Sequence, residues 1–402
     1  MVNVAVLGYG TVGSGVVEII NKNNALISKR VGKEIQVKYV LDLREFEGDP
    51  VQKILTHNFE DIKNDKDVQI VVETMGGLHP AYEFVKAALE EGKNVCTSNK
   101  ALVEAYGPEL IALAKEKNVN FLFEASVGGG IPIIRPLRDC LAPEEVLEIS
   151  GILNGTTNYI LTEMTDNGSK FDDVLKDAQD KGYAEKDPTA DVCGHDAARK
   201  IAILTSLAYG KSVAFEDVYT EGITEISDKD IVYAKNLKKK IKITGTARKN
   251  GDKVSIHVNP VLLSKAHPLY NIDGVYNAIM VRGNMVDDVV FTGQGAGKLP
   301  TASAVVSDVI EAAKFIDSNI NIEWSEEKLS LEAFDDTEWQ YFVRVQGNAS
   351  DLSDSIKATF GDVSFQDAGF NEEVAFVTPK IAENKFNELI NSFKLINKIR
   401  LS

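Results

Sequence analysis

The sequence predicts an α/β fold in three parts, and three observations support this prediction. Apolar strands and amphipathic helices alternate over the first third of the chain, which is typical of a parallel sheet. Four strands with turn signals between them follow over residues 241–291 and favour an antiparallel sheet in an α+β domain. Residues 340–401 predict the element order βαββαβ, which is that of a ferredoxin-like fold.

Composition restricts the class of protein. Of the 402 residues, 44% are hydrophobic and 26% are charged, so the chain can bury a large core. The net charge of -16 argues against a nucleic-acid partner, and the basic run at 238–240 is better explained as a solvated helix end. The three cysteines, Cys96, Cys140 and Cys193, form no CxxC pair, so neither a zinc site nor a disulfide framework is predicted.

Targeting signals are not evident in the sequence. No apolar run reaches the roughly 18 residues of a membrane span, and the first residues lack the organisation of a signal peptide. We therefore expect a cytoplasmic protein that acts without a membrane.

The first predicted strand leads directly into a glycine-rich turn and a helix. Strand, GxGxxG and helix in this order are the dinucleotide-binding fingerprint. Gly8 would make the tight turn, Gly10 would let the backbone approach the pyrophosphate, and Gly13 would let helix and strand pack closely. We therefore predict a Rossmann-type nucleotide-binding domain over residues 1–130, with NAD or NADP as cofactor. The predicted binding turn consists of Gly8, Tyr9, Gly10, Thr11, Val12 and Gly13.

The second predicted strand, 35–41, ends at Asp42. An acid at this position would bind the ribose 2′-hydroxyl of NAD, whereas an arginine close by, such as Arg44, would favour the 2′-phosphate of NADP. Because the two signals conflict, and both residues are also explained as ordinary loop charges, the choice between NAD and NADP stays open.

Polar residues stand where the next two predicted strands end. Strand 68–74 ends at Thr74, and strand 94–97 is followed by Ser98 and Lys100. Ligands of open parallel sheets bind beyond the carboxyl ends of the strands, so we expect these three side chains to face the cofactor. Lys100 is also a candidate for chemistry, with an ordinary loop lysine as the alternative. Further on, Pro108 is expected to begin a helix.

Two more glycine-rich loops are prominent. Residues 125–132 contain three consecutive glycines before a proline, and such irregular backbone exposes carbonyl oxygens that can bind a hard cation; a hinge between domains is the alternative. Gly293 and Gly295 precede a long helix expected to end near residue 317, a position suited to an anion or to one edge of a cofactor.

The chemistry-bearing stretch runs over residues 183–204. An acidic loop ends at Asp191, and on the helix that follows Asp196 and Lys200 are four residues apart, so they share one face. Together with Glu185, three carboxylates would converge on one ammonium. Carboxylates hold a lysine charged, whereas burial lowers its pKa and prepares it for proton transfer. A surface helix with a weak salt bridge is the alternative.

A helix is also expected after Asn154, running to about residue 166. Thr156 or Thr157 would cap it, and the free amides at its start would suit a substrate carboxylate.

Six motifs, in this order, resemble those of homoserine dehydrogenases over residues 1–320. The resemblance implies the reversible, NAD(P)-dependent interconversion of L-homoserine and L-aspartate 4-semialdehyde, a step toward threonine, methionine and isoleucine. It also implies a homodimer, which could pair into tetramers, formed through an α+β catalytic and dimerisation domain at 131–320; the helix 300–317 would return to the cofactor domain. The motifs are GYGTVG (8–13), TSNKA (97–101), EASVGGGIP (124–132), LNGTTNYI (153–160), DPTADVCGHDAARK (187–200) and GQGAGKLPTASAV (293–305).

The resemblance implies a role for single residues. Lys200 looks like the proton donor and acceptor at the substrate hydroxyl, and Lys100 is similar to a lysine near nicotinamide and substrate. The residues that look like substrate-binding positions are Glu185, Asp191, Asp196, Asn154, Gly155 and Thr156. The residues that resemble positions whose carbonyl oxygens bind a structural sodium ion are Glu124, Val127, Gly129 and Ile131.

The chain departs from the family pattern in two places. Val40-Leu41-Asp42 stands where the family often has Val-Arg-Asp, so the usual arginine for a 2′-phosphate is missing. The C-terminal part, 337–402, resembles an ACT-like regulatory domain in topology. However, its first turn reads QGNASDL (346–352) instead of Asp-x-Pro-Gly-Val-Leu, so threonine as an effector at this domain stays open.

Two other functions compete with this one. A phosphorylating semialdehyde dehydrogenase would need a cysteine nucleophile beside a base, and neither Cys96 nor Cys193 has an evident base. A non-catalytic, nucleotide-dependent amino-acid sensor would use the folds only for binding, and the presence of Asp196 and Lys200 argues against it.

Overall fold

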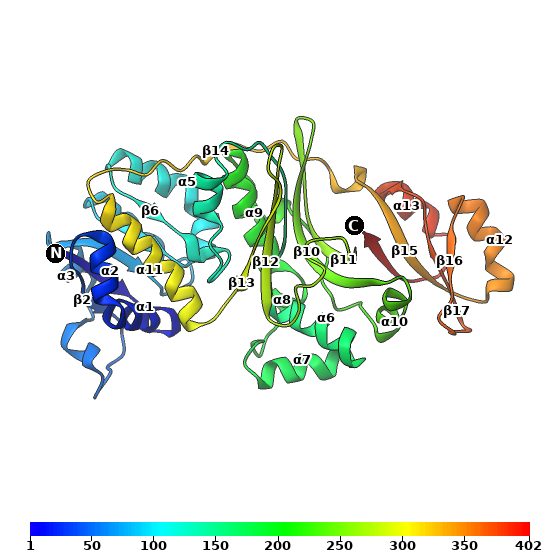
Figure 1. Ribbon diagram of the computed structural model, residues 1–402, viewed down its shortest axis with the longest axis horizontal. Coiled ribbons are helices and arrows are strands. Elements are labelled where there is room, and N and C mark those ends of the chain that lie inside the picture. Colours follow the sequence, from blue (N-terminus) through cyan, green and yellow to red (C-terminus); the bar gives the residue numbers. More distant parts are fainter. The chain divides into compact units, whose positions relative to one another are not determined.

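The computed structural model describes residues 1–402, and the chain divides into two compact units (Figure 1). The first unit contains Met1–Glu144, Ala202–Phe215 and Phe291–Leu329, and the second contains Glu145–Ile201, Glu216–Val290 and Ser330–Ser402. None of the helices combines the length and the apolar character that a membrane span requires.

The first unit contains a six-stranded parallel sheet, as predicted. Its strand order, β3-β2-β1-β4-β5-β6, reverses direction between β1 and β4, and ligands of doubly wound sheets bind at such a switch point. The strands are β1 (Val2–Leu7), β2 (Ile35–Leu41), β3 (Leu55–Thr56), β4 (Val68–Glu73), β5 (Asn94–Thr97) and β6 (Phe121–Leu122).

Helices pack on this sheet through apolar faces. In Figure 1 the helix α11, from the last third of the chain, lies beside α1 and α2; Val305 and Val309 of α11 share a core with Val16 and Ile20 of α1. A segment distant in sequence thus completes the nucleotide-binding fold. The helices of this unit are α1 (Thr11–Lys22), α2 (Asn24–Val31), α3 (Phe59–Lys63), α4 (Ala81–Glu90), α5 (Lys100–Glu116) and α11 (Lys298–Lys314); β8 (Lys211–Ser212) and β14 (Ser325–Lys328) form a small separate sheet.

The prediction that a helix begins at Pro108 is wrong. The helix α5 begins at Lys100, and Pro108 lies inside it. Asn99 sets the start, because its side chain accepts a hydrogen bond from the Leu102 amide at 3.1 Å. The residue before the proline, Gly107, packs on the Trp324 ring so closely that a Cβ atom there would lie 2.8 Å from it. Tertiary packing therefore outweighs the helix-breaking tendency of proline.

The second unit contains an 11-stranded sheet whose central part, β12-β7-β10-β11, is antiparallel as predicted. The full order is β13-β12-β7-β10-β11-β19-β15-β17-β16, with β9 paired to β11 and β18 paired to β15. The strands are β7 (Val146–Ile152), β9 (Tyr219–Thr220), β10 (Lys239–Asn250), β11 (Lys253–Ser264), β12 (Tyr276–Gly283), β13 (Asp287–Gln294), β15 (Glu338–Gln346), β16 (Ser364–Gln366), β17 (Glu373–Val377), β18 (Ile381–Ala382) and β19 (Leu395–Leu401).

The C-terminal segment has the predicted βαββαβ order, with the two-residue strand β18 added. Its strands lie in the order β19-β15-β17-β16, which is the ferredoxin-like arrangement. Strand β19 also pairs in parallel with β11, through Val261–Arg400 and Leu262–Leu401, so the segment belongs to the same sheet as the middle part of the chain. The division into domains 1–130, 131–320 and 337–402 stays a prediction. The helices that begin in this unit are α6 (Gly155–Asn167), α7 (Phe171–Asp180), α8 (Thr189–Val192), α9 (His195–Tyr209), α10 (Asp228–Asn236), α12 (Ala349–Phe360) and α13 (Glu383–Ile390).

Candidate active site

Lys200 and Asp196 lie one turn apart on α9 and form a buried ion pair. Lys200 Nζ is 2.8 Å from Asp196 Oδ2 and donates a second hydrogen bond, also 2.8 Å long, to the Leu153 carbonyl oxygen. The two side chains are only 10% and 7% exposed, so this is not the weak surface salt bridge that was the alternative. Two of the three ammonium donors are thereby used inside the protein.

Asn154 joins this pair to Asp191. Its Nδ2 donates to Asp191 Oδ1 at 2.8 Å and to Asp196 Oδ2 at 2.9 Å. The structure therefore brings Asn154, Asp191, Asp196 and Lys200 into one hydrogen-bonded group, which we call the Asn154 cluster.

The prediction that Thr156 or Thr157 caps α6 is wrong. Asn154 is the cap, because its Oδ1 accepts the Thr157 amide at 2.9 Å. Asparagine is among the most favourable N-cap residues, and here one side chain both caps a helix and holds two acids. Thr156 instead donates from its hydroxyl to the Tyr183 carbonyl oxygen.

The prediction that Asp191 ends a loop is wrong, because Asp191 lies in the short helix α8. The helix α8 follows Pro188, and the Thr189 amide is bonded to Asp187 Oδ1 at 3.1 Å, so proline stands before a helical turn where its missing N–H costs nothing. Gly194 separates α8 from α9 with φ of 84°, a conformation that favours glycine.

Glu185 does not belong to the Asn154 cluster. Its residue is exposed to solvent, and its carbonyl oxygen accepts a hydrogen bond from Gln179 Nε2 at 3.1 Å. In this structure only Asp196 contacts the Lys200 ammonium directly, and Asp191 is linked to this pair through Asn154. The predicted convergence of three carboxylates on one ammonium is therefore reduced to two.

In the first unit the GxGxxG turn has the geometry that a dinucleotide needs. Gly8 has φ of 90°, and a Cβ atom on Gly13 would lie 1.9 Å from the Gly8 carbonyl oxygen, so helix and strand pack closely. No atom lies within 4 Å of the Cβ position of Gly10, and no side chain caps α1. Open space and free amides at this helix start fit a pyrophosphate. The Thr74 hydroxyl donates to the carbonyl oxygens of Leu7 and Gly8, and so fixes the turn.

Asp42 and Arg44, which gave conflicting signals for the cofactor, pair with each other. Arg44 Nε and Nη2 donate to the two carboxylate oxygens of Asp42, at 2.9 Å each, and this pairing holds the pKa of Asp42 well below its usual range. Asp42 also accepts the Tyr9 amide at 2.8 Å and is therefore held at the glycine turn. The Arg44 side chain, in contrast, is 61% exposed, so only its partner is fixed in place.

Lys100 is the first residue of α5, and its position depends on residues that the sequence did not single out. Asn99 caps the helix, donates from Nδ2 to the Gly77 carbonyl oxygen at 2.6 Å, and has its amide bonded to the Thr97 hydroxyl. Thr97 in turn donates to the carboxylate of Glu73, which is fully buried and has its pKa raised by burial. A lone acid at the end of the apolar run 68–73 is the signal that could have revealed it. Ser98 donates its amide to the Glu73 carbonyl oxygen.

The two glycine-rich loops predicted separately lie against each other. Gly130 donates its amide to the Gln294 carbonyl oxygen at 3.0 Å, and a Cβ atom on Gly129 would lie 2.3 Å from the Gly295 carbonyl oxygen. The strand β6 before the first loop covers only Phe121–Leu122, and a 3-10 turn begins at Glu124.

The Glu124 carboxylate accepts the amides of Ile133, Ile134 and Arg135 at 2.6–2.8 Å and so fixes the loop. Within the loop, the Ile131 amide donates to the Gly128 carbonyl oxygen at 2.9 Å. No group of three His, Cys, Asp or Glu side chains in the structure is arranged to hold a metal ion. A cation at this loop would therefore depend on main-chain oxygens.

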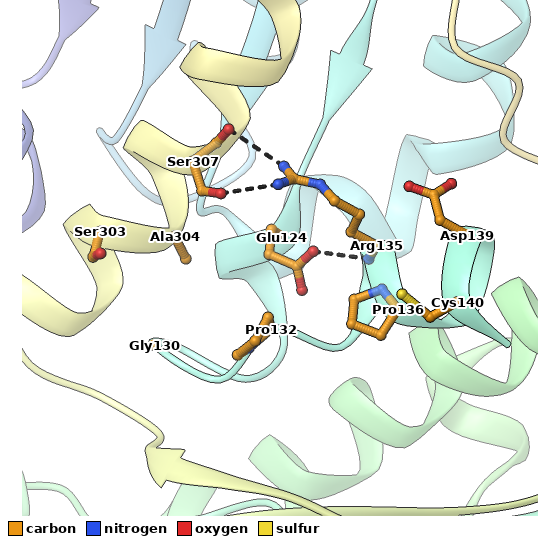
Figure 2. Close-up of a pocket in the computed structure, with 10 residues that line it drawn as sticks. All are labelled: Glu124, Gly130, Pro132, Arg135, Pro136, Asp139, Cys140, Ser303, Ala304 and Ser307. Carbon is orange, nitrogen blue, oxygen red and sulfur yellow. Dashed lines mark hydrogen bonds between the residues drawn. The ribbon is translucent and has the colours of Figure 1, made fainter. Parts of the chain in front are cut away.

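A cavity of about 320 Å³ beside this loop was not predicted (Figure 2). Its charged groups are already paired: Glu124 binds three amides, and Arg135 donates to Ser307 and to the carboxylates of Asp308 and Glu311. Figure 2 shows the Arg135 side chain turned toward Ser307 on α11. These bonds hold α11 to the loop, so the polar side chains that line the cavity stabilise the fold.

Comparison with known proteins gives a consistent result. The model of the homoserine dehydrogenase NAD-binding domain matches residues 8–124, and that of the homoserine dehydrogenase domain matches residues 132–310. The chain is 44% identical to a homoserine dehydrogenase of Neisseria gonorrhoeae over 321 residues, which are 79% of this chain and 74% of that protein. It is 44% identical to that of Bacillus subtilis over 316 residues, 78% of this chain and 73% of that protein.

Solved structures agree with these relatives. A homoserine dehydrogenase from Thiobacillus denitrificans superposes with a TM-score of 0.89 at 35% identity, covering 100% of this chain and 98% of the other. A hyperthermophilic archaeal homoserine dehydrogenase in complex with NADPH has a TM-score of 0.66 at 31% identity, covering 77% of this chain and 97% of the other. The resemblance drawn from six motifs is confirmed: the chain is an oxidoreductase with a nucleotide-binding domain and belongs to the homoserine dehydrogenase family.

Proposed function

We propose that this chain interconverts L-homoserine and L-aspartate 4-semialdehyde with NAD or NADP, and that the reaction takes place at the Asn154 cluster. The observation that carries this proposal is the buried pair of Lys200 and Asp196, joined through Asn154 to a second acid. A positioned amine held by hydrogen bonds is what alcohol oxidation needs for its proton.

In this proposal the acids bind the substrate ammonium and the helix start binds its carboxylate. Asp191 and Asp196 supply negative charge, and Glu185 adds a third acid from the exposed segment beside them. The amides of Gly155 and Thr156 stand in the first turn of α6, where the helix dipole favours an anion. Both charges of the amino-acid substrate would thus be bound by residues of the second unit.

Lys200 moves the proton of the substrate hydroxyl. Its remaining donor position is available to a substrate oxygen, because Asp196 and the Leu153 carbonyl use the other two. In the oxidative direction the amine of Lys200 takes the hydroxyl proton, and in the reductive direction it returns a proton to the aldehyde oxygen. Lys100 is proposed to assist. The nicotinamide cofactor, when bound, accepts or supplies the hydride.

The cofactor would be held by the first unit. The free amides and open space at Gly10 suit the pyrophosphate. Gly293 and Gly295, on the loop before α11, are proposed to contact one edge of the cofactor. Asp42 would bind the ribose 2′-hydroxyl of NAD, and exposed Arg44 would bind the 2′-phosphate of NADP. Thr74 and Ser98 are proposed to line the same site, at the ends of β4 and β5.

The remaining proposals follow the family resemblance. A structural sodium ion would be bound by carbonyl oxygens of Glu124, Val127, Gly129 and Ile131, in a loop that Glu124 already fixes. The chain would form homodimers through residues 131–320, with tetramers as a further possibility, and threonine is a candidate effector at the C-terminal segment. A cytoplasmic location is supported by three cysteines that are all free.

Cys96 is unsuited to be the nucleophile of a cysteine-dependent semialdehyde dehydrogenase, the alternative function. Cys96 lies fully buried inside β5, and burial raises the pKa of its thiol well above the ordinary value, which disfavours the reactive thiolate.

The initial rate with L-homoserine, followed as nicotinamide reduction with NAD and NADP side by side and with and without threonine, tests the proposed function. Lys200→Ala should lower kcat by roughly 10²- to 10⁴-fold, because general acid–base catalysis contributes that much. Cofactor binding by this variant should be unchanged. A wild-type protein that binds cofactor and never turns over homoserine would instead be an amino-acid sensor.

A further inference from the structure

Arg400, on the last strand of the second unit, is buried among acceptors. Its Nε and Nη2 donate to the two carboxylate oxygens of Glu383 at 2.9 Å each, and its Nη1 donates to Glu221 Oε2 at 2.7 Å. The Tyr219 hydroxyl oxygen lies 3.3 Å from Nη2, and the arginine side chain is 0% exposed. The Arg400–Glu383 pair is buried, whereas the Glu221 side chain is 31% exposed, so Arg400 holds a partly exposed acid from inside the protein by a charge-assisted hydrogen bond.

Glu221 begins a segment that packs directly on the turn carrying Asp191. The Glu221 amide is bonded to the Val258 carbonyl oxygen at 2.8 Å, so the segment is fixed to the sheet. At the next residue, Gly222, a Cβ atom would lie 2.2 Å from the Val192 carbonyl oxygen and 2.7 Å from Cys193 Cα. The Ile223 amide then donates to the same Val192 oxygen at 2.9 Å.

Val192 follows Asp191 in α8, and Asp191 is bonded to Asn154. An unbroken series of short contacts therefore runs from the C-terminal strand, through Glu221 and Gly222, to an acid of the Asn154 cluster. We propose that Arg400, Glu221 and Gly222 are positioning residues for Asp191, so that the C-terminal segment takes part in binding the substrate. This inference rests on the proposed function, in which Asp191 binds the homoserine ammonium.

The same segment offers a matched control. Arg344 of β15 is also buried, 3% exposed, and is paired at 2.8 Å with Asp230 and Glu373. These bonds hold the capping box at the start of α10, formed by Ser227 and Asp230, and not the α8 turn. Loss of either arginine should cost stability, but only loss of Arg400 should displace Asp191.

Gly222→Ala in the full-length protein is the direct test. The added methyl group would clash with backbone atoms of Val192 and Cys193, so the two segments must move apart. The KM for L-homoserine should rise about tenfold, because a displaced carboxylate loses a charge-assisted hydrogen bond to the ammonium. The KM for the cofactor and kcat should stay unchanged, since neither depends on Asp191.

Glu221→Gln, which adds no heavy atom, and Arg400→Lys should raise the same KM, whereas Arg344→Lys should lower only the melting temperature. Unchanged KM for homoserine in the Gly222, Glu221 and Arg400 variants, or an equal rise in Arg344→Lys, would overturn the inference alone. No turnover by the wild-type protein would overturn the proposed function and the inference with it.

Discussion

Asn154 and Lys200 donate to the same atom, Asp196 Oδ2, at 2.9 Å and 2.8 Å. The lysine approaches from one turn further along α9, and the asparagine approaches from the start of α6. One carboxylate oxygen thus fixes the proposed acid–base group relative to the helix start that would bind the substrate carboxylate.

Asn154→Ser separates the two roles of this residue. Serine caps helices about as well as asparagine, so the melting temperature should change little. A serine hydroxyl is too short to reach both aspartates, so the KM for homoserine should rise about tenfold through loss of hydrogen bonds to charged groups. Steady-state kinetics and thermal unfolding measure the two effects.

Asn154→Ala is the comparison for this variant, because it removes the cap as well. It should lose a further ~1 kcal/mol of unfolding free energy relative to the serine variant. Equal stability of the two variants would mean that the cap contributes nothing.

Two glycines of the nucleotide turn should respond differently to alanine. In Gly10→Ala the added methyl group meets no atom within 4 Å, so the protein should stay as stable as the wild type. The methyl group should raise the KM for the cofactor, because it occupies the space through which the pyrophosphate approaches the backbone. In Gly13→Ala the Cβ atom would lie 1.9 Å from the Gly8 carbonyl oxygen, and overpacking of this kind costs about 1–3 kcal/mol. Cofactor titration and thermal unfolding of both variants check this; weaker cofactor binding without a stability difference between them would contradict it.

Arg44→Ala tests which cofactor the Asp42–Arg44 pair serves. The arginine is exposed, so its removal should change the unfolding free energy by less than about 0.5 kcal/mol. It should lower kcat/KM with NADP about tenfold relative to NAD, because a charge-assisted bond to the 2′-phosphate is lost. Arg30→Ala, an exposed arginine in the last turn of α2, is the control. An unchanged ratio of the two cofactors would exclude Arg44 from phosphate binding.

His257 should make the second unit sensitive to acid. Its ring is buried edge-on against Trp339, 5.1 Å between centroids, and burial together with the charge of Arg400 lowers its pKa to about 3. In the unfolded chain His257 has an ordinary histidine pKa and binds a proton below pH ~6.5, whereas in the folded chain it binds this proton only below about pH 3. Stability should therefore fall as pH drops through this window, by up to about 1.4 kcal/mol per pH unit from this residue.

His257→Phe should remove that part of the pH dependence while it fills the same aromatic surroundings. Urea unfolding of both proteins at pH 5 and pH 7.5 measures the difference. Parallel pH profiles would show that the histidine contributes nothing to acid sensitivity.

Some errors in the sequence prediction concern which residue caps a helix, and others concern contacts between distant segments. Pro108 signals a helix start locally, but Asn99 and the packing of Gly107 on Trp324 start the helix earlier. The Thr156–Thr157 pair is a good cap by composition, yet Asn154 caps the helix. Glu73 carries no local motif, because its importance comes from the amides and the Thr97 hydroxyl that tertiary folding brings to it.

The sequence by itself determined what depends on neighbours along the chain. Helix geometry places residues four apart on one face, so the pairing of Asp196 with Lys200 was predictable, as was the GxGxxG turn, whose parts lie within six residues. Only the tertiary structure decided that Asn154 reaches across 37 and 42 residues to two acids, that Gly129 lies against Gly295, and that β19 joins β11. Such contacts depend on the packing of a whole core, whereas local periodicity reports only on the face that each segment buries.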